Sequence, residues 1–110
     1  AMRTEQERGQ GERFEALRKV IVPLLKPYAR RIAVFGSYAR GEMTPESDID
    51  ILISLKPPSE RPLLGLNWFG LWNQIERQLQ RKVDLVSEAA LSPYIREQVE
   101  RDQVILYEEE

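Results

Sequence analysis

The sequence predicts an α/β domain of the α+β kind, in which helices pack against one small mixed β-sheet. Short apolar runs typical of strands alternate with longer segments whose apolar residues recur every three or four positions, as on one face of a helix. The 110 residues, 42% hydrophobic and 31% charged, fit one globular domain with its own core. We therefore expect a single domain over 12–107, between a flexible N-terminal segment 1–11 and an acidic tail 108–110.

The elements are expected in the order helix, strand, turn, strand, helix, strand, helix. They are a helix over 12–26, a strand over 31–35, a helical turn over 38–41, a loop over 42–47, a strand over 49–54, a proline-rich loop over 55–62, a helix over 66–80, a strand over 82–86, a short helix opened by Ser92 and a terminal strand in "VILY". The strand segments are short and rich in Ile and Val, as buried strands are.

The helices are expected from their apolar stripes. These are Phe14, Leu17, Ile21 and Leu24 in the first helix, Trp68, Trp72, Ile75 and Leu79 in the second, and Ile95 and Val99 in the last. Because proline removes a backbone donor, Pro23 predicts that the first helix ends or kinks near Val22. Ser92 is placed to cap the last helix, with Pro93 at its first position. The stretch "LNWFGLW" either packs in the core or offers a partner-docking surface, since aromatic residues are enriched at interface hot spots.

Composition excludes several classes of site. The chain has no cysteine and no histidine, so disulfides, thiolate or imidazole metal sites and His- or Cys-based catalysis are excluded. Any metal would be held by oxygen, which favours magnesium, manganese or calcium. With a net charge of −2 and a pI near 5.3, direct nucleic acid binding is not expected. Without a membrane-length apolar run or a signal core in the polar segment 1–11, we expect a cytoplasmic protein that does not enter a membrane. Ala1, which precedes Met2, is taken as an expression remnant.

The stretch "AVFGSYARGEMTPESDIDILI", residues 33–53, concentrates the residues capable of chemistry. Side chains at positions i and i+2 of a strand point to the same face, so Asp48 and Asp50 project together, away from the isoleucines of the core. Their Cα atoms are expected about 6.6 Å apart, from a rise of about 3.3 Å per residue. Such a pair can converge on one ion or bracket two, and magnesium suits carboxylates that share a site with phosphates. The alternative is a pair of solvated acids at the entrance of a strand.

Gly36 and Ser37 follow the preceding strand and suit a phosphate. A glycine at a strand end lets the backbone approach a ligand closely. Ser37 is expected to cap the turn over 38–41, which Gly41 ends, and the free N–H groups of that turn favour an anion. Arg40 is expected either to contact phosphate oxygens or to pair with the acidic cluster.

Asp84 is the third candidate carboxylate, between Val83 and Leu85 in the strand over 82–86. If that strand neighbours 49–54, at a strand spacing of about 4.8 Å, Asp84 can join the other two aspartates. In a chain without histidine, a carboxylate is the expected base for activating an acceptor hydroxyl. The alternatives are a polar residue on an edge strand and Glu88 as the third carboxylate.

Gly36, Ser37, Arg40, Gly41, Ser47, Asp48 and Asp50 stand as G-S-Y-A-R-G-(x5)-S-D-I-D-I-L-I. This pattern resembles the signature of the polymerase-β-type nucleotidyltransferase superfamily, and in so short a chain it resembles the minimal branch, the MNT proteins. The resemblance implies a nucleotidyltransferase-like fold and the transfer of a nucleoside monophosphate to a hydroxyl. By the same resemblance, Asp48, Asp50 and Asp84 bind two magnesium ions, and Gly36 and Ser37 hold phosphate.

The resemblance to MNT proteins also implies a partner. Such proteins act as antitoxins that transfer AMP from ATP to a tyrosine of a HEPN-domain ribonuclease toxin and thereby silence it. Two alternatives stay open. One is a non-catalytic antitoxin that acts by binding, and the other is a nucleotidyltransferase for a small molecule or an RNA end.

Overall fold

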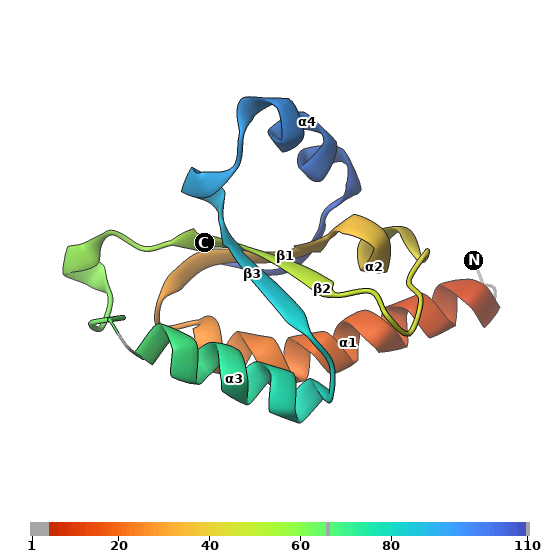
Figure 1. The fold of residues 1–110 in the computed structure, drawn as a ribbon, viewed down its shortest axis with the longest axis horizontal. Helices are drawn as coiled ribbons and strands as arrows, with labels where there is room; N and C mark the ends of the chain where they lie inside the picture. The colour runs from red at the N-terminus through yellow and green to blue at the C-terminus, as the bar shows by residue number, and fades with distance from the viewer. Residues whose placement is uncertain (1–4, 66, 110) are drawn as a thin grey trace.

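The computed structural model describes residues 5–65 and 67–109 (Figure 1). Its elements are α1 (Glu5–Leu25), β1 (Ala29–Phe35), α2 (Gly36–Arg40), β2 (Ile49–Leu55), η1 (Pro58–Glu60), α3 (Asn67–Leu79), β3 (Val83–Ser87), η2 (Glu88–Ala90), α4 (Pro93–Asp102) and β4 (Val104–Glu108). The expected succession of helices and strands is confirmed. Among the described residues, none of the helices combines the length and the apolar character needed to cross a bilayer.

The strands form one mixed sheet of four strands in the order β3-β2-β1-β4. β1 runs antiparallel to both β2 and β4, whereas β2 and β3 are parallel. A parallel pair needs a crossover connection, and α3 lies in the chain between these two strands. The predicted mixed sheet with helices against it is therefore confirmed.

The two faces of the sheet are covered unequally. α1 and α3 lie together against one face, and α4 lies on the other (Figure 1). Alternation along the strands sends one set of apolar side chains toward α1 and α3, including the fully buried Ile32, Ile51 and Ile53. Burial of each such side chain contributes about 1.5–3 kcal/mol. The opposite face carries a smaller core, in which Val99 of α4 packs on Ala33 and Leu52.

α1 begins earlier than predicted, and it does not end at Val22, one of the two outcomes expected of Pro23. It begins at Glu5, seven residues before the expected start, so residues 5–11 are helical where a flexible segment was expected. Residues 1–4 of that segment lie outside the described part of the chain. The helix also continues past Val22 to Leu25, with Pro23 inside it. The missing N–H of Pro23 removes one backbone hydrogen bond, and the chain still closes a further turn with a bond from Lys26 N to Val22 O of 2.8 Å.

The other helices mostly follow their patterns. α3 buries Ile75 and packs Trp68, Trp72 and Leu79 against the core, as its stripe predicts. Of the predicted helix over 66–80, residue 66 is not among the described residues. The predicted cap of α4 is confirmed, since the Ser92 hydroxyl accepts a hydrogen bond from Tyr94 N at 3.1 Å. The inward position predicted for Ile95 is wrong, because this side chain is 52% exposed. The buried residue of α4 on the sheet is Val99, whereas Ile95, one turn earlier in the helix, is not part of that core.

Candidate active site

Three aspartates lie at or just before the start of two neighbouring strands. Asp50 of β2 is paired with Asp84 of the parallel strand β3, and Asp48 stands one residue before β2 begins. Neighbouring strands are about 4.8 Å apart, so register alone brings Asp50 and Asp84 together. The predicted adjacency of Asp84 to the Asp48–Asp50 pair is therefore confirmed. On its other side Asp50 is paired with Phe35, the last residue of β1.

Gly36 is required by the side chain of Asp50. Its backbone has φ +72°, a conformation that favours glycine, and a Cβ atom placed there would collide with Oδ2 of Asp50. From the sequence, this glycine was expected to let a ligand approach the backbone closely. In the structure, the group that approaches is the carboxylate of Asp50. Gly36 therefore decides where that carboxylate can lie.

Asp50 lies in a partly buried and negatively charged environment. Its pKa is raised above the ordinary value of 3.8, first because the side chain is partly buried and then because Asp84 and Asp48 add negative charge. The positive charge of Arg40 opposes this shift in part. Within residues 5–65 and 67–109, no three acidic side chains already surround one point as a metal cage. The three aspartates are therefore neighbours in the sheet without forming a preassembled metal site in this structure.

The short helix α2 follows β1 without the predicted cap. Phe35 occupies the capping position and makes no side-chain hydrogen bond, while Ser37 lies inside the helix, so the capping role predicted for Ser37 is wrong. The helix begins two residues earlier than expected because the left-handed backbone at Gly36 allows the chain to turn there. Gly41 ends the helix with φ 76°, as predicted. Tyr38 anchors α2 in the core, where its ring meets Phe14 edge-on with centroids 6.0 Å apart.

Arg40 is engaged by two carboxylates outside the aspartate cluster. Its guanidinium lies 3.0 Å from Glu42 and 3.1 Å from Asp102 of α4. Of the two predicted contacts, pairing with the cluster itself is not seen among the described residues, although the charge of Arg40 acts on Asp50. The predicted contact with phosphate stays a prediction.

Arg81 holds the loop before Asp48 in place, a role that the sequence did not predict. Its guanidinium donates to the carbonyl oxygens of Thr44 and of Ser47, the latter at 3.1 Å. The Ser47 hydroxyl in turn accepts a hydrogen bond from Thr44 N at 3.1 Å, so the loop before Asp48 also has an internal hydrogen bond. Because Arg81 is far along the chain from this loop, no local pattern indicated the contact.

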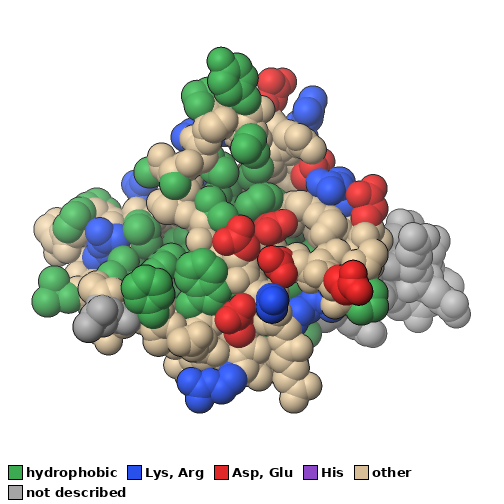
Figure 2. Space-filling view, in the orientation of Figure 1, with side chains coloured by type: hydrophobic (Ala, Val, Ile, Leu, Met, Phe, Trp, Pro, Cys, Tyr) green, Lys and Arg blue, Asp and Glu red, His purple; other side chains and the backbone are tan. Residues whose placement is uncertain are grey.

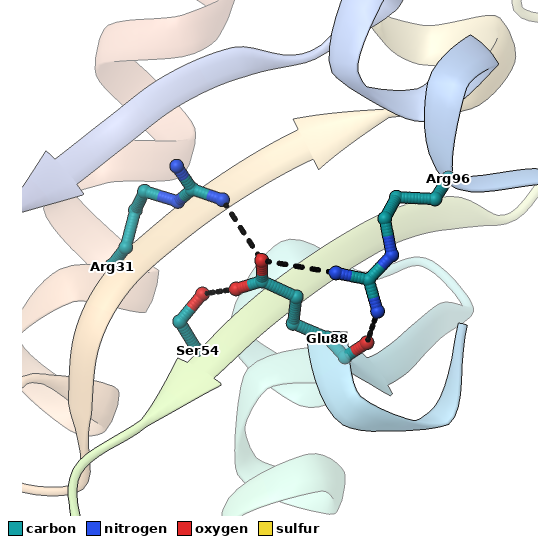
Figure 3. A network of polar contacts seen from close by, with 4 residues as sticks. All are labelled: Arg31, Ser54, Glu88 and Arg96. Carbon is teal, nitrogen blue, oxygen red and sulfur yellow. Dashed lines mark hydrogen bonds and ion pairs between the residues drawn. The ribbon is translucent and has the colours of Figure 1, made fainter. Parts of the chain in front are cut away.

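Glu88, the alternative third carboxylate, is held away from the cluster. It accepts a hydrogen bond from the buried hydroxyl of Ser54 and lies 3.5 Å from Arg31 and 3.8 Å from Arg96 (Figure 3). Arg96 also donates to the Glu88 carbonyl at 3.3 Å. This network joins β1 and β2 to α4 and leaves Asp84 as the carboxylate that accompanies Asp50.

A cleft of about 410 Å³ opens beside Asp84, between α3 and the start of β3. It is lined by Asp48, Phe69, Trp72, Asn73, Glu76, Lys82, Val83 and Asp84. Trp72 is held in its wall by a 2.6 Å hydrogen bond from the indole N–H to the Val83 carbonyl. Phe69 is 61% exposed, which is unusual for a large aromatic side chain. Figure 2 shows acidic side chains at the centre of this face, with large apolar side chains directly beside them.

Comparison with known proteins gives consistent matches. Residues 15–106 match the family model described as nucleotidyltransferase domain. The chain is 38% identical over 94 residues to "Putative protein adenylyltransferase MJ0126" of Methanocaldococcus jannaschii, covering 84% of this chain and 92% of that relative. It is 41% identical over 75 residues to protein adenylyltransferase MntA of Thermococcus cleftensis, covering 68% and 72%. A crystal structure of a toxin–antitoxin with AMP-PNP superposes with a TM-score of 0.67 at 28% identity, covering 83% of this chain and 73% of that one.

Proposed function

Since the chain belongs to the nucleotidyltransferase domain family and is by homology a protein adenylyltransferase, we propose that it is an antitoxin that transfers AMP from ATP to a tyrosine hydroxyl of a cognate HEPN toxin and so neutralises that toxin. The observation that carries the proposal is the register that pairs Asp50 with Asp84 beside Gly36. The similarity to a toxin–antitoxin crystallised with AMP-PNP supports both the nucleotide and the class of partner.

The donor set fits a hard divalent cation. Asp48, Asp50 and Asp84 supply carboxylate oxygens only, which is the chemistry that Mg²⁺ prefers. Burial raises the pKa of Asp50, and the negative charges of Asp84 and Asp48 raise it further, so a bound cation would favour the ionised carboxylate. When bound, Mg²⁺ would neutralise charge on the triphosphate. Gly36, Ser37 and Arg40 would hold the phosphates on the α2 side.

The reaction is a displacement at the α-phosphorus of ATP. The tyrosine oxygen forms a bond to that phosphorus, and the bond from phosphorus to the oxygen that bridges to the β-phosphate breaks. Pyrophosphate leaves with the bonding electron pair, and the phenolic proton passes to a carboxylate. Asp84, which is exposed beside the cleft, is placed to accept it. The chain's contribution is mainly positioning and charge.

The test is to mix the protein with labelled ATP, Mg²⁺ and the product of its neighbouring gene. We expect label and added mass on a tyrosine of that product, and neither with the Asp48→Asn, Asp50→Asn double variant. The Leu63→Ala variant is the control, because Leu63 is 92% exposed and lies outside the cleft. Label transfer that survives in the double variant would sink the assignment of these residues. Toxin neutralisation that survives without label transfer would favour an antitoxin that acts by binding.

A further inference from the structure

We propose that the cleft between α3 and β3 is the acceptor subsite, where the phenol ring of a tyrosine from the partner protein packs against Phe69 and Trp72. This inference rests on the proposed function and assigns a place to the second substrate. It gives the exposed Phe69 and the partly buried Trp72 of α3 a role in choosing the acceptor.

The order of residues across the sheet places the acceptor on this side. Strand pairing puts Phe35, Asp50 and Asp84 in a row across β1, β2 and β3. Gly36 continues from Phe35 at one end of the row, and the cleft adjoins Asp84 at the other end. In Figure 1, α2 lies accordingly on the far side of β2 from β3.

In-line displacement then separates the two substrates. The attacking and leaving oxygens lie roughly in line through the reacting phosphorus. If the phosphates that leave as pyrophosphate are held near Gly36 and Ser37, the attacking hydroxyl must arrive from the opposite side. That side is the mouth of the cleft beside Asp84.

The walls of the cleft suit an aromatic ring that carries a hydroxyl. Phe69 presents its exposed ring, and Trp72 is fixed by its bond to Val83 O. Glu76 is fixed as well, since its carboxylate accepts a hydrogen bond from Val83 N at 2.9 Å. Lys82 adds a positive charge that favours a developing phenolate. A serine or threonine acceptor would leave the two aromatic rings uncovered, so the cleft selects tyrosine.

The acceptor and the leaving group take opposite sides of the α-phosphorus during AMP transfer. The phenolic oxygen at the mouth of the cleft bonds to the α-phosphorus, pyrophosphate leaves on the α2 side with the bonding electron pair, and the phenolic proton goes to Asp84. No oxidant, reductant or further reactant is needed.

Binding is tested first, because it does not depend on turnover. The ¹⁵N-labelled protein is titrated with N-acetyl-tyrosine amide, and N-acetyl-serine amide is the matched probe. We expect amide shifts at Phe69, Asn73 and Asp84 with the tyrosine probe and none with the serine probe. Absence of shifts, or shifts confined to α2, would overturn the proposal. Phe69→Ala should abolish the shifts, and Leu63→Ala should leave them unchanged.

Kinetic measurements then decide whether the cleft binds the phenol ring of the acceptor or the nucleobase of ATP. For Phe69→Ala we expect the KM of the tyrosine acceptor to rise about tenfold with the KM of ATP unchanged, and Phe69→Tyr should restore the acceptor KM. Phe69 is exposed, so the variant should fold. A rise in the KM of ATP alone would assign the ring to the nucleobase and overturn the inference, as would no change in either constant. If the unmodified protein transfers no AMP to any tyrosine, the proposed function fails instead, while the titration still decides whether the cleft binds a phenol.

Discussion

Replacement of Gly36 by alanine is the most direct test of how the site is built. The new Cβ would occupy the space of Asp50 Oδ2, and alanine would have to adopt φ +72°. The backbone term costs about 1–2 kcal/mol. The carboxylate must also move by on the order of 1 Å to restore ordinary contact, and a misplacement of that size can lower a rate about a hundredfold. We therefore expect the free energy of unfolding to fall by about 2 kcal/mol, and kcat for AMP transfer to fall far more than stability alone explains.

The assay pairs urea unfolding with AMP transfer under conditions in which the variant is fully folded. Gly70→Ala is the matched control, since a Cβ there meets nothing within 4 Å and the residue lies inside α3. That control should gain about 0.5–1 kcal/mol of stability and keep its activity. Wild-type stability and activity in Gly36→Ala would refute the argument that this glycine sets the position of Asp50.

Three further perturbations test the electrostatics and the supports of the site. The pKa of Asp50 is raised in the folded state, so in the absence of divalent cations the folded protein binds the Asp50 proton more tightly than the unfolded chain does. The free energy of unfolding should therefore fall as pH rises from 3.8, the ordinary pKa, through the pKa of the folded state. Asp50→Asn should remove that dependence in urea titrations at several pH values; an unchanged pH profile would contradict the cause assigned to the shift. Arg81→Ala should lower the free energy of unfolding by about 1 kcal/mol, because the hydrogen bond to Ser47 O is lost, and should lower kcat by loosening the loop before Asp48. An unchanged free energy of unfolding and an unchanged rate of AMP transfer would contradict this role of Arg81. Glu88→Ala should cost about 1–3 kcal/mol in thermal or urea unfolding, since the Ser54 hydroxyl is left buried without an acceptor. The activity of the Glu88→Ala variant should be proportional to its folded fraction. A loss of kcat in fully folded variant protein would instead indicate that Glu88 takes part in catalysis.

The elements and the faces of their side chains could be predicted from the sequence, because both follow from local periodicity. Alternation along β2 and the residue before it already indicated that Asp48 and Asp50 point away from the core. The mixed character of the sheet was predicted as well, and the structure confirms it. Errors arose at Ser37 and Ile95, where the outcome depends on how near an element's end a residue lies or on what packs above it.

The local pattern also identified Gly36 as special, although for an incomplete reason. The sequence marks a glycine after a strand, but the atom that excludes a side chain there belongs to Asp50, which comes from the neighbouring strand. Arg81 and the Glu88 network likewise depend on contacts between residues far apart in the chain. Such contacts are specified by the joint packing of all elements and leave no periodic trace in any one of them.

The sequence by itself determined the type of each main element, the paired aspartates, the glycine before them and the restriction to oxygen ligands, since these depend on residue type and on spacing within one segment. Only the tertiary structure decided that β3 lies parallel to β2, that Asp84 rather than Glu88 stands beside Asp50, and that the aromatic side chains of α3 open a cleft at that point. The physical reason is that strand register and helix placement minimise the free energy of the whole core at once. A carboxylate in one segment therefore acquires its partners only when distant segments have packed.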